Sequence, residues 1–264
     1  MTSISNSVSD TLKYSKYFHY PLDTTKLHTW LISSKTVSLK LIQERYPQVL
    51  NKTQRIFLNT RARISADKIS QHSKLFIFLN LVPTILGVFV TGSVSVENAR
   101  EEDDLDLMII TKVNTLWLTR LLIVPFLKIF YSIRSANNKG LVSKLACLNL
   151  WLDEQGLLVP KNNQSLYTAH EVLQVKPIID KNQIYQRFIQ SNRWTKNYLA
   201  NAYQQFVGSS IANKLHPNQI LGILNEIAFL IQKIYMSRRR TREYLTQHSA
   251  YFHPLPPPTV ILKS

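Results

Sequence analysis

The chain has 264 residues, of which 45% are hydrophobic and 18% are charged, and this composition excludes a disordered, fibrous or highly charged solvating protein. Its single cysteine, Cys147, excludes a disulfide framework and a cysteine-based zinc cluster, and fits a reducing compartment. The 32 Lys and Arg residues outnumber the 16 Asp and Glu residues, which gives a formal net charge of +16. We therefore expect an anionic partner, although charge alone does not choose between nucleotide, nucleic acid and membrane surface.

Residues 75–96 form a stretch of 22 residues without a charged side chain. The stretch contains Asn80, Pro83 and Gly87 and finishes in polar residues, so its apolar part is shorter than the roughly 20 residues that a membrane span requires. The first residues, MTSISNSVSDTLKY, lack the apolar region of a secretory signal. We expect no membrane span and a cytoplasmic location.

Residues 1–70 are expected to form a helical N-terminal segment. An aromatic turn at Tyr17–Leu22 is followed by Asp23, a candidate N-cap. The spacing of apolar residues from Leu27 to Ile42 predicts two short helices. Residues 54–79 show a basic amphipathic helical pattern. Its basic side chains are Arg55, Arg61, Arg63 and Lys68.

The period of the pattern changes in residues 71–160. The β-branched runs Ile85–Thr91 and Leu105–Thr111 predict two strands joined by a short polar segment. An apolar helix is expected at Leu116–Ile133, and a third strand at Leu145–Leu152. These elements predict an α+β protein with a small mixed sheet at its centre.

Beyond Pro160 the pattern is helical, and residues 161–250 are expected to form a helical C-terminal subdomain. Residues 251–264 are rich in proline and read as an extended tail. The adjacent pair His170 and Glu171 is interpreted as surface polarity, because neighbours on a helix do not share a face. The candidate helices cover residues 167–175, 182–206 and 218–245.

Six of the sixteen acidic residues lie between Glu97 and Asp106, in a chain that is otherwise strongly basic. Such clustering is unfavourable unless a cation shares it. Asp104 and Asp106 flank Leu105 at the start of a predicted strand, so both carboxylates point to one face, roughly 6 to 7 Å apart at the backbone. Oxygen ligands of this kind favour Mg²⁺ or Mn²⁺, which also bind phosphate oxygens. We therefore predict a metal site at Asp104 and Asp106.

Gly92 and Ser93 end the first predicted strand. A residue without a Cβ lets backbone N–H groups approach an anion, and the short helix expected next offers its positive end. We predict a phosphate site here, facing the metal site.

Gly92-Ser93, then ten residues, then Asp104-Leu105-Asp106-Leu107 resembles the signature of the polymerase-beta-like nucleotidyltransferase superfamily. The resemblance covers about residues 70–155. It implies transfer of a nucleoside monophosphate from a nucleoside triphosphate to an acceptor hydroxyl, with two metal ions at the attacking and leaving oxygens. By this resemblance Asp104 and Asp106 ligate the metal, while Gly92 and Ser93 hold the triphosphate.

Three positions depart from that signature. Asn149 stands where the family supplies a third carboxylate, and its amide oxygen can ligate a metal but cannot act as a base. Val96 and Glu97 stand where many members carry Arg-Gly, and Arg100 is the candidate replacement for that phosphate contact. Asp103 stands where Ser is common.

Three functions stay open at this point. The leading one is a metal-dependent nucleotidyltransferase, and the alternative is a catalytically degenerate relative that binds nucleotide or nucleic acid. The third is a basic peripheral-membrane or scaffold protein. The sequence indicates neither the acceptor, which is an RNA, a protein hydroxyl or a small molecule, nor the oligomeric state. Arg238, Arg239, Arg240 and Arg242 near the end of the last predicted helix complement the negative end of the helix dipole, and a nucleic-acid contact is the sharper alternative for this cluster.

Overall fold

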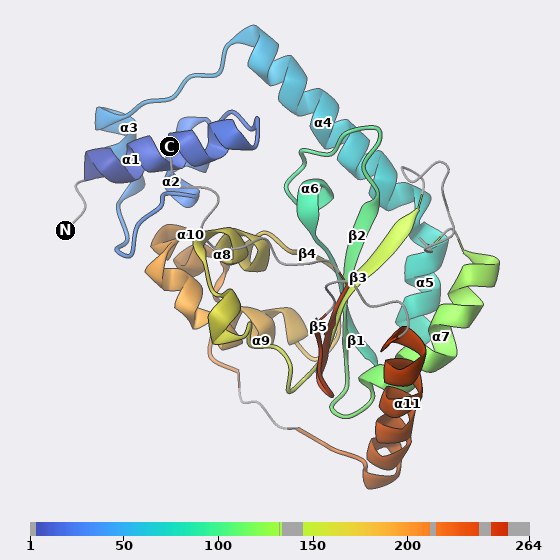
Figure 1. Cartoon of the computed structure of the whole chain (residues 1–264). Coiled ribbons are helices and arrows are strands. Elements are labelled where there is room, and N and C mark those ends of the chain that lie inside the picture. Colours follow the sequence, from blue (N-terminus) through green and yellow to red (C-terminus); the bar gives the residue numbers. More distant parts are fainter. Residues whose placement is uncertain (1–3, 132, 134–144, 212–214, 238–243, 253–264) are drawn as a thin grey trace.

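A six-stranded mixed sheet, with strand order β4-β1-β2-β3-β6-β5, forms the centre of the molecule (Figure 1). The structure is a computed structural model, and the sheet with its surrounding helices confirms the predicted α+β class. The described residues are 4–131, 133, 145–211, 215–237 and 244–252.

The three predicted strands are present as β1 (Ile85–Val90), β2 (Leu105–Thr111) and β3 (Ala146–Asp153). β1 runs antiparallel to β2, and β3 runs parallel to β2. Every residue of β1 is buried, and every residue of β2 except Asp106 is buried. Their nearly continuous apolar runs reflect a sheet that is covered on both faces.

Three further strands lie in the segment predicted to be helical: β4 (Lys176–Asp180), β5 (Tyr244–Leu245) and β6 (Ser249–Tyr251). β4 pairs with β1 and β6 pairs with β3, so the C-terminal segment completes the central sheet. The prediction of helices alone beyond Pro160 is therefore wrong. Strands of two to five residues are too short to show a period of their own.

One face of the sheet packs against three helices that Figure 1 shows together beside β1 and β2. α11 is fixed on this side by two polar contacts with Trp117. Asn225 Oδ1 accepts the backbone N–H of Trp117 at 2.7 Å, and Gln232 Nε2 donates to the carbonyl of Trp117 at 2.8 Å. The helices are α5 (Ser73–Leu81), α7 (Leu116–Phe130) and α11 (Gln219–Ser237).

The opposite face packs against a second group of helices. The single helix predicted over residues 182–206 is broken at Asn192, which is fully buried. Its side chain accepts from the backbone N–H of Val159 at 2.9 Å and donates to the carbonyl of Leu157 at 2.8 Å, which holds the chain in a turn. The elements are α8 (Leu166–Leu173), α9 (Ile184–Ser191), a 3₁₀ helix (Arg193–Asn197) and α10 (Ala200–Phe206).

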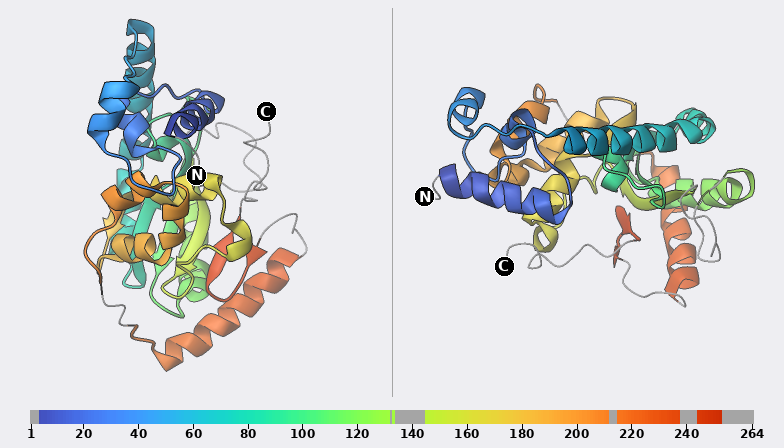
Figure 2. Two further views of the ribbon diagram at one scale, coloured as in Figure 1. Left: turned by 90° about the vertical axis from the view of Figure 1, so that its left-hand side faces the viewer. Right: turned by 90° about the horizontal axis from the view of Figure 1, so that it is seen from above.

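The N-terminal helices form a smaller core of their own beside α8 and α10 (Figures 1 and 2). Asp23 caps α2 as predicted, because its side chain accepts the backbone N–H of Lys26 at 2.7 Å. α1 lies in the segment predicted to be helical, although no separate helix is predicted over its own residues, and it places Tyr14 against His170 of α8, with ring centroids 4.2 Å apart. The helices are α1 (Ile4–Tyr17), α2 (Thr24–Thr29) and α3 (Leu39–Arg45).

The basic stretch before the sheet forms two helices, α4 (Lys52–Gln71) and α5, which meet at His72. Among the helices of the described residues, none combines the length and the apolar character needed to cross a membrane, in line with the prediction of no span. The predicted Arg238–Arg242 cluster and the proline-rich tail beyond Phe252 lie outside the described residues.

Candidate functional site

Two carboxylates and a thiol converge where β2 and β3 begin. Asp104, Asp106 and Cys147 each offer one ligand atom, and these three atoms lie within 4.8 Å of one another. β1 ends at the same edge because it is antiparallel to β2, while β3 begins there because it is parallel to β2. The sheet topology thus brings Gly92 and the two carboxylates together, as the sequence predicts.

Gly92 is required by its backbone and by its neighbour. Its φ is +64°, and a Cβ at this position would lie 2.9 Å from Asp106 Oδ2. An L-residue would therefore be strained and would also displace the carboxylate. The position predicted for the approach of an anion is in direct contact with the predicted metal ligand.

Ser93 and Arg100 meet at a different carboxylate. Ser93 Oγ donates to Asp103 Oδ2 at 2.7 Å, and the backbone N–H of Arg100 donates to the same oxygen at 2.9 Å. Asp103 therefore organises the loop between α6 (Gly92–Ser95) and β2. The guanidinium of Arg100 lies 3.9 Å from Glu102 in an exposed ion pair, and Arg100 is not among the described residues that line the pocket beside Gly92.

The acidic loop is held from outside by α4. Lys68 is buried, and its Nζ donates to the carbonyls of Glu101 at 2.9 Å and Asp103 at 2.6 Å. Arg61 donates to the carbonyl of Ala99 at 3.1 Å. These two side chains therefore stabilise the site loop and do not form part of an open basic surface. The other members of the predicted cluster, Arg55 and Arg63, are exposed.

Asn149 reaches the site through a bulge in β3. Asp106 pairs with Cys147 while Met108 pairs with Leu150, so β3 carries one extra residue in between. The side-chain amide of Asn149 donates to Asp106 Oδ1, and its Oδ1 lies 2.6 Å from the Sγ of Cys147. Asn149 therefore lies beside Asp106, as the predicted strand register requires, and its amide N–H points to that carboxylate.

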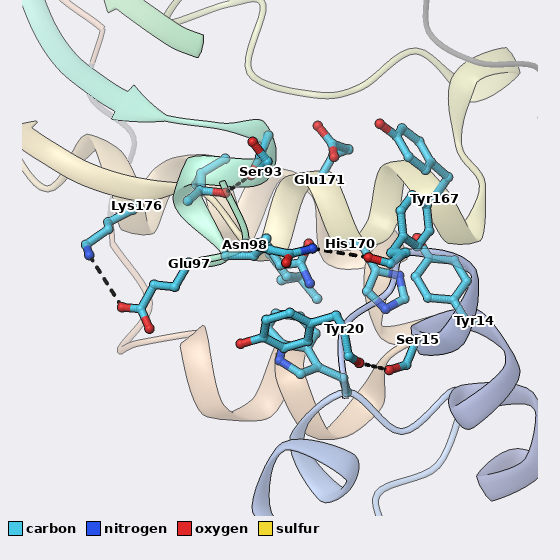
Figure 3. A pocket seen from close by; sticks show the side chains of 18 of the residues that line it. Tyr14, Ser15, Tyr20, Ser93, Glu97, Asn98, Tyr167, His170, Glu171 and Lys176 are labelled. Atoms are coloured by element: carbon cyan, nitrogen blue, oxygen red, sulfur yellow. Dashed lines mark hydrogen bonds and ion pairs between the residues drawn. The ribbon is translucent and has the colours of Figure 1, made fainter. Parts of the chain in front are cut away.

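A pocket of about 610 Å³ opens beside Gly92 and Ser93, between α1, α6 and α8 (Figure 3). Its volume lies in the range typical of small-molecule sites. Aromatic rings make up much of its wall, and such rings stack on planar ligands. They are Tyr14, Phe18, Tyr20, Trp30, Tyr167, Tyr185 and Phe206.

His170 and Glu171 both line this pocket, which overturns their interpretation as surface polarity. His170 is 4% exposed and its Nδ1 lies 3.0 Å from the carbonyl of Leu166. Burial lowers the pKa of His170 to about 4, so its ring is neutral at neutral pH. Burial raises the pKa of Glu171, although a hydrogen bond from Tyr167 opposes that shift. His170 stacks on Tyr14 of α1 and Glu171 receives the hydrogen bond of Tyr167, so these two neighbours on α8 both have protein partners.

Lys176 borders the pocket at the end away from His170 (Figure 3). Among the described residues that line the pocket, it is the one Lys or Arg side chain. Its Nζ lies 3.8 Å from Glu97 in a half-exposed ion pair. Sequence reasoning missed it because β4, the strand that carries it, was read as part of a helical region.

Comparisons of the chain with family models, with curated proteins and with solved structures give no match.

The donor atoms fit a divalent metal. Carboxylate oxygens suit Mg²⁺ and Mn²⁺, whereas a thiolate is a softer ligand. Asp104 and Asp106 supply the hard donors, and Asn149 Oδ1 lies beside Cys147 at the same strand end. The residues present therefore fit the metal that the sequence predicts through the two carboxylates.

Proposed function

We propose that the chain is a metal-dependent nucleotidyltransferase that moves a nucleoside monophosphate from a nucleoside triphosphate to an acceptor hydroxyl. One observation carries the proposal. The ligand atoms of Asp104 and Asp106 lie together, Asp106 lies against Gly92, and Gly92 and Ser93 line a pocket of nucleotide size. Metal donors, a phosphate-facing turn and a nucleoside-sized pocket are the parts that this reaction needs.

Each group has a role in this proposal. Asp104 and Asp106 hold Mg²⁺ or Mn²⁺, which, when bound, neutralises charge on the phosphate oxygens. The backbone of Gly92 and Ser93 borders the triphosphate, and Lys176 supplies a positive charge within the pocket lining. The aromatic wall receives the base by stacking and keeps water from the nucleoside.

Metal-dependent nucleotide binding tests the proposal. Calorimetric titration with each nucleoside triphosphate, with Mn²⁺ and with a chelator, is expected to show binding that requires the metal. Asp104→Ala and Asp106→Ala should each weaken that metal-dependent binding by about 100-fold, because a direct ligand matters at least as much as the groups that orient it. Glu44→Ala removes an exposed carboxylate on α3 and is the matched control. Wild-type affinity in both site variants would place the nucleotide elsewhere.

A second candidate function is supported by Asn149. Asn149 occupies the position of the third carboxylate and donates an amide N–H to Asp106. A neutral amide cannot act as the base that removes the proton of the attacking hydroxyl. This favours a module that binds nucleotide without turnover. Release of labelled pyrophosphate, in the presence of RNA or of protein acceptors, separates the two functions.

Asn149→Asp sharpens that separation. A charged oxygen in place of the amide should tighten Mn²⁺ binding, measured by titration without nucleotide. If pyrophosphate release rises in the same variant, the natural Asn149 limits turnover. Unchanged metal affinity would show that position 149 does not contribute to the metal site.

A further inference from the structure

The outward side of α11 carries an apolar surface, here called the α11 stripe. Its residues are between 43% and 71% exposed. α11 lies at the margin of the molecule in both views of Figure 2, with the rest of the fold on one side of it. The α11 stripe consists of Ile220, Ile223, Leu224, Ile227, Leu230 and Ile231.

The opposite side of α11 already has its partners. Asn225, Ala228 and Gln232 are buried against α7, with the polar contacts to Trp117 described above. These contacts fix the rotation of the helix about its axis, so the stripe cannot turn inward. A contiguous apolar surface of this kind is unusual on a monomer and marks an interaction site.

The stripe follows a heptad pattern. Ile220 and Ile227 are seven residues apart, and Ile223 and Leu230 repeat the same interval three residues later. Apolar residues at these two alternating positions are what helices use to pack along each other in a coiled coil. Ile234 continues the first series. The geometry expected of the missing partner is therefore another helix with the same pattern.

We propose that the α11 stripe binds the α11 stripe of a second copy of this chain, with the two helices antiparallel. In this arrangement Ile227 packs beside Leu230 of the second copy, and the pairing is the same in both directions, as a two-fold interface requires. The six side chains are each at least 43% exposed, so they offer apolar area toward the roughly 800 Å² that each partner contributes to a standard interface.

The flanking charges favour this occupant. Glu226 and Lys233 are exposed and lie seven residues apart along one flank of the stripe. In the antiparallel pair Glu226 of each copy faces Lys233 of the other, which gives two complementary contacts. In a parallel pair both would face apolar positions. An anionic membrane would instead need a basic flank, whereas this flank carries one charge of each sign.

The mass of the full chain in solution tests the proposal. Light scattering on the eluting protein at micromolar concentration should give twice the 30.6 kDa of the chain. Ile227→Glu should weaken association by about 100-fold, since it buries a charge at the centre of the interface. Leu122→Glu, which charges an exposed apolar residue of α7, is the matched control and should leave the dimer intact. Circular dichroism and thermal unfolding of each variant are the controls for folding.

Charge exchange tests the antiparallel geometry. Glu226→Lys alone places lysines opposite one another and should weaken the dimer, and Lys233→Glu alone should do the same with glutamates. The double exchange should restore association. A monomeric wild type, or a dimer unaffected by Ile227→Glu, would overturn the proposal. So would a monomer whose binding to vesicles of anionic lipid is lost in Ile227→Glu, because a membrane would then be the occupant.

Discussion

The two ends of β2 and β3 both carry a pair of carboxylates, and the surroundings of the two pairs differ. Where β3 ends, Asp153 is fully buried and accepts the backbone N–H groups of Asn114 at 3.0 Å and Gln155 at 2.8 Å, while its other contacts include the His248 ring. Glu154 binds Arg187 at 2.6 Å in an almost fully buried ion pair.

Where the strands begin, Asp104 and Asp106 are only partly buried. Their neighbours are Cys147 and Asn149, which carry donor atoms of their own. The comparison teaches how to tell two kinds of acidic pair apart. Backbone N–H groups bind Asp153 and a buried guanidinium binds Glu154, whereas the second pair converges with a thiol and an amide that can also bind a metal.

The largest effect should come from breaking the buried pair. Arg187→Ala leaves Glu154 charged and buried, and should lower the free energy of unfolding by about 3 to 5 kcal/mol in urea titrations. Arg100→Ala, which removes an exposed pair with Glu102 beside the site, is the control and should cost less than about 1 kcal/mol. A loss below about 1 kcal/mol for Arg187→Ala would show that the buried Arg187–Glu154 ion pair contributes no more to stability than the exposed Arg100–Glu102 ion pair.

The pH dependence of stability should differ between His170, which lines the pocket, and His248, which contacts Asp153. Burial lowers the pKa of His170 to about 4, against an ordinary value near 6.5. Between these two pH values His170 is protonated in the unfolded chain but neutral in the folded protein. This contribution to stability is complete above about pH 6.5 and is lost as the pH falls toward 4, by about 3 kcal/mol in total.

His248 should act in the opposite direction. Its hydrogen bond to Asp153 raises its pKa, so its contribution is present below the ordinary pKa and is lost as the pH rises through the raised value. Urea titrations from pH 4 to 9 on wild type, His170→Gln and His248→Gln measure both. The acid loss should shrink in the first variant and the alkaline loss in the second. The reverse assignment would contradict both the burial of His170 and the hydrogen bond of His248 to Asp153.

The smallest effect should come from Gly92→Ala. The positive φ and the close approach to Asp106 predict a loss of about 1 to 3 kcal/mol in unfolding free energy, with weaker metal-dependent nucleotide binding. Gly222→Ala in α11 is the control, because a Cβ there meets its nearest atom at 3.9 Å. It should leave stability unchanged or raise it by up to about 1 kcal/mol. Equal effects at both glycines would contradict a special role for Gly92.

The strands at the centre of the sheet were predictable because their signal is local. β1 and β2 are short apolar runs that contain several β-branched residues, and Asp104 and Asp106 stand at the start of β2 with the spacing that puts both on one face. Asn149 was aligned with them correctly, although the bulge that turns it toward Asp106 leaves no trace in the pattern of hydrophobic residues.

The elements that were missed depend on contacts distant in sequence. β4 contains Pro177 and is a strand only because β1, some ninety residues earlier, offers it an edge. Lys176 was lost with it. Arg61 and Lys68 read as a basic surface because nothing nearby in the sequence shows that their partners are carbonyls of the acidic loop. These contacts form only in the folded protein, where α4 packs against the acidic loop.

The pairing of β6 with β3 has a consequence for synthesis. Leu152 pairs with Ser249, which is 97 positions further along the chain, so the outer edge of β3 stays open until almost all of the described protein has been made. Contacts so distant in sequence form slowly, and an open strand edge recruits other chains. We expect the nascent chain to depend on chaperones that shelter this edge, and any shortening that removes Ser249–Tyr251 to turn the protein toward aggregation.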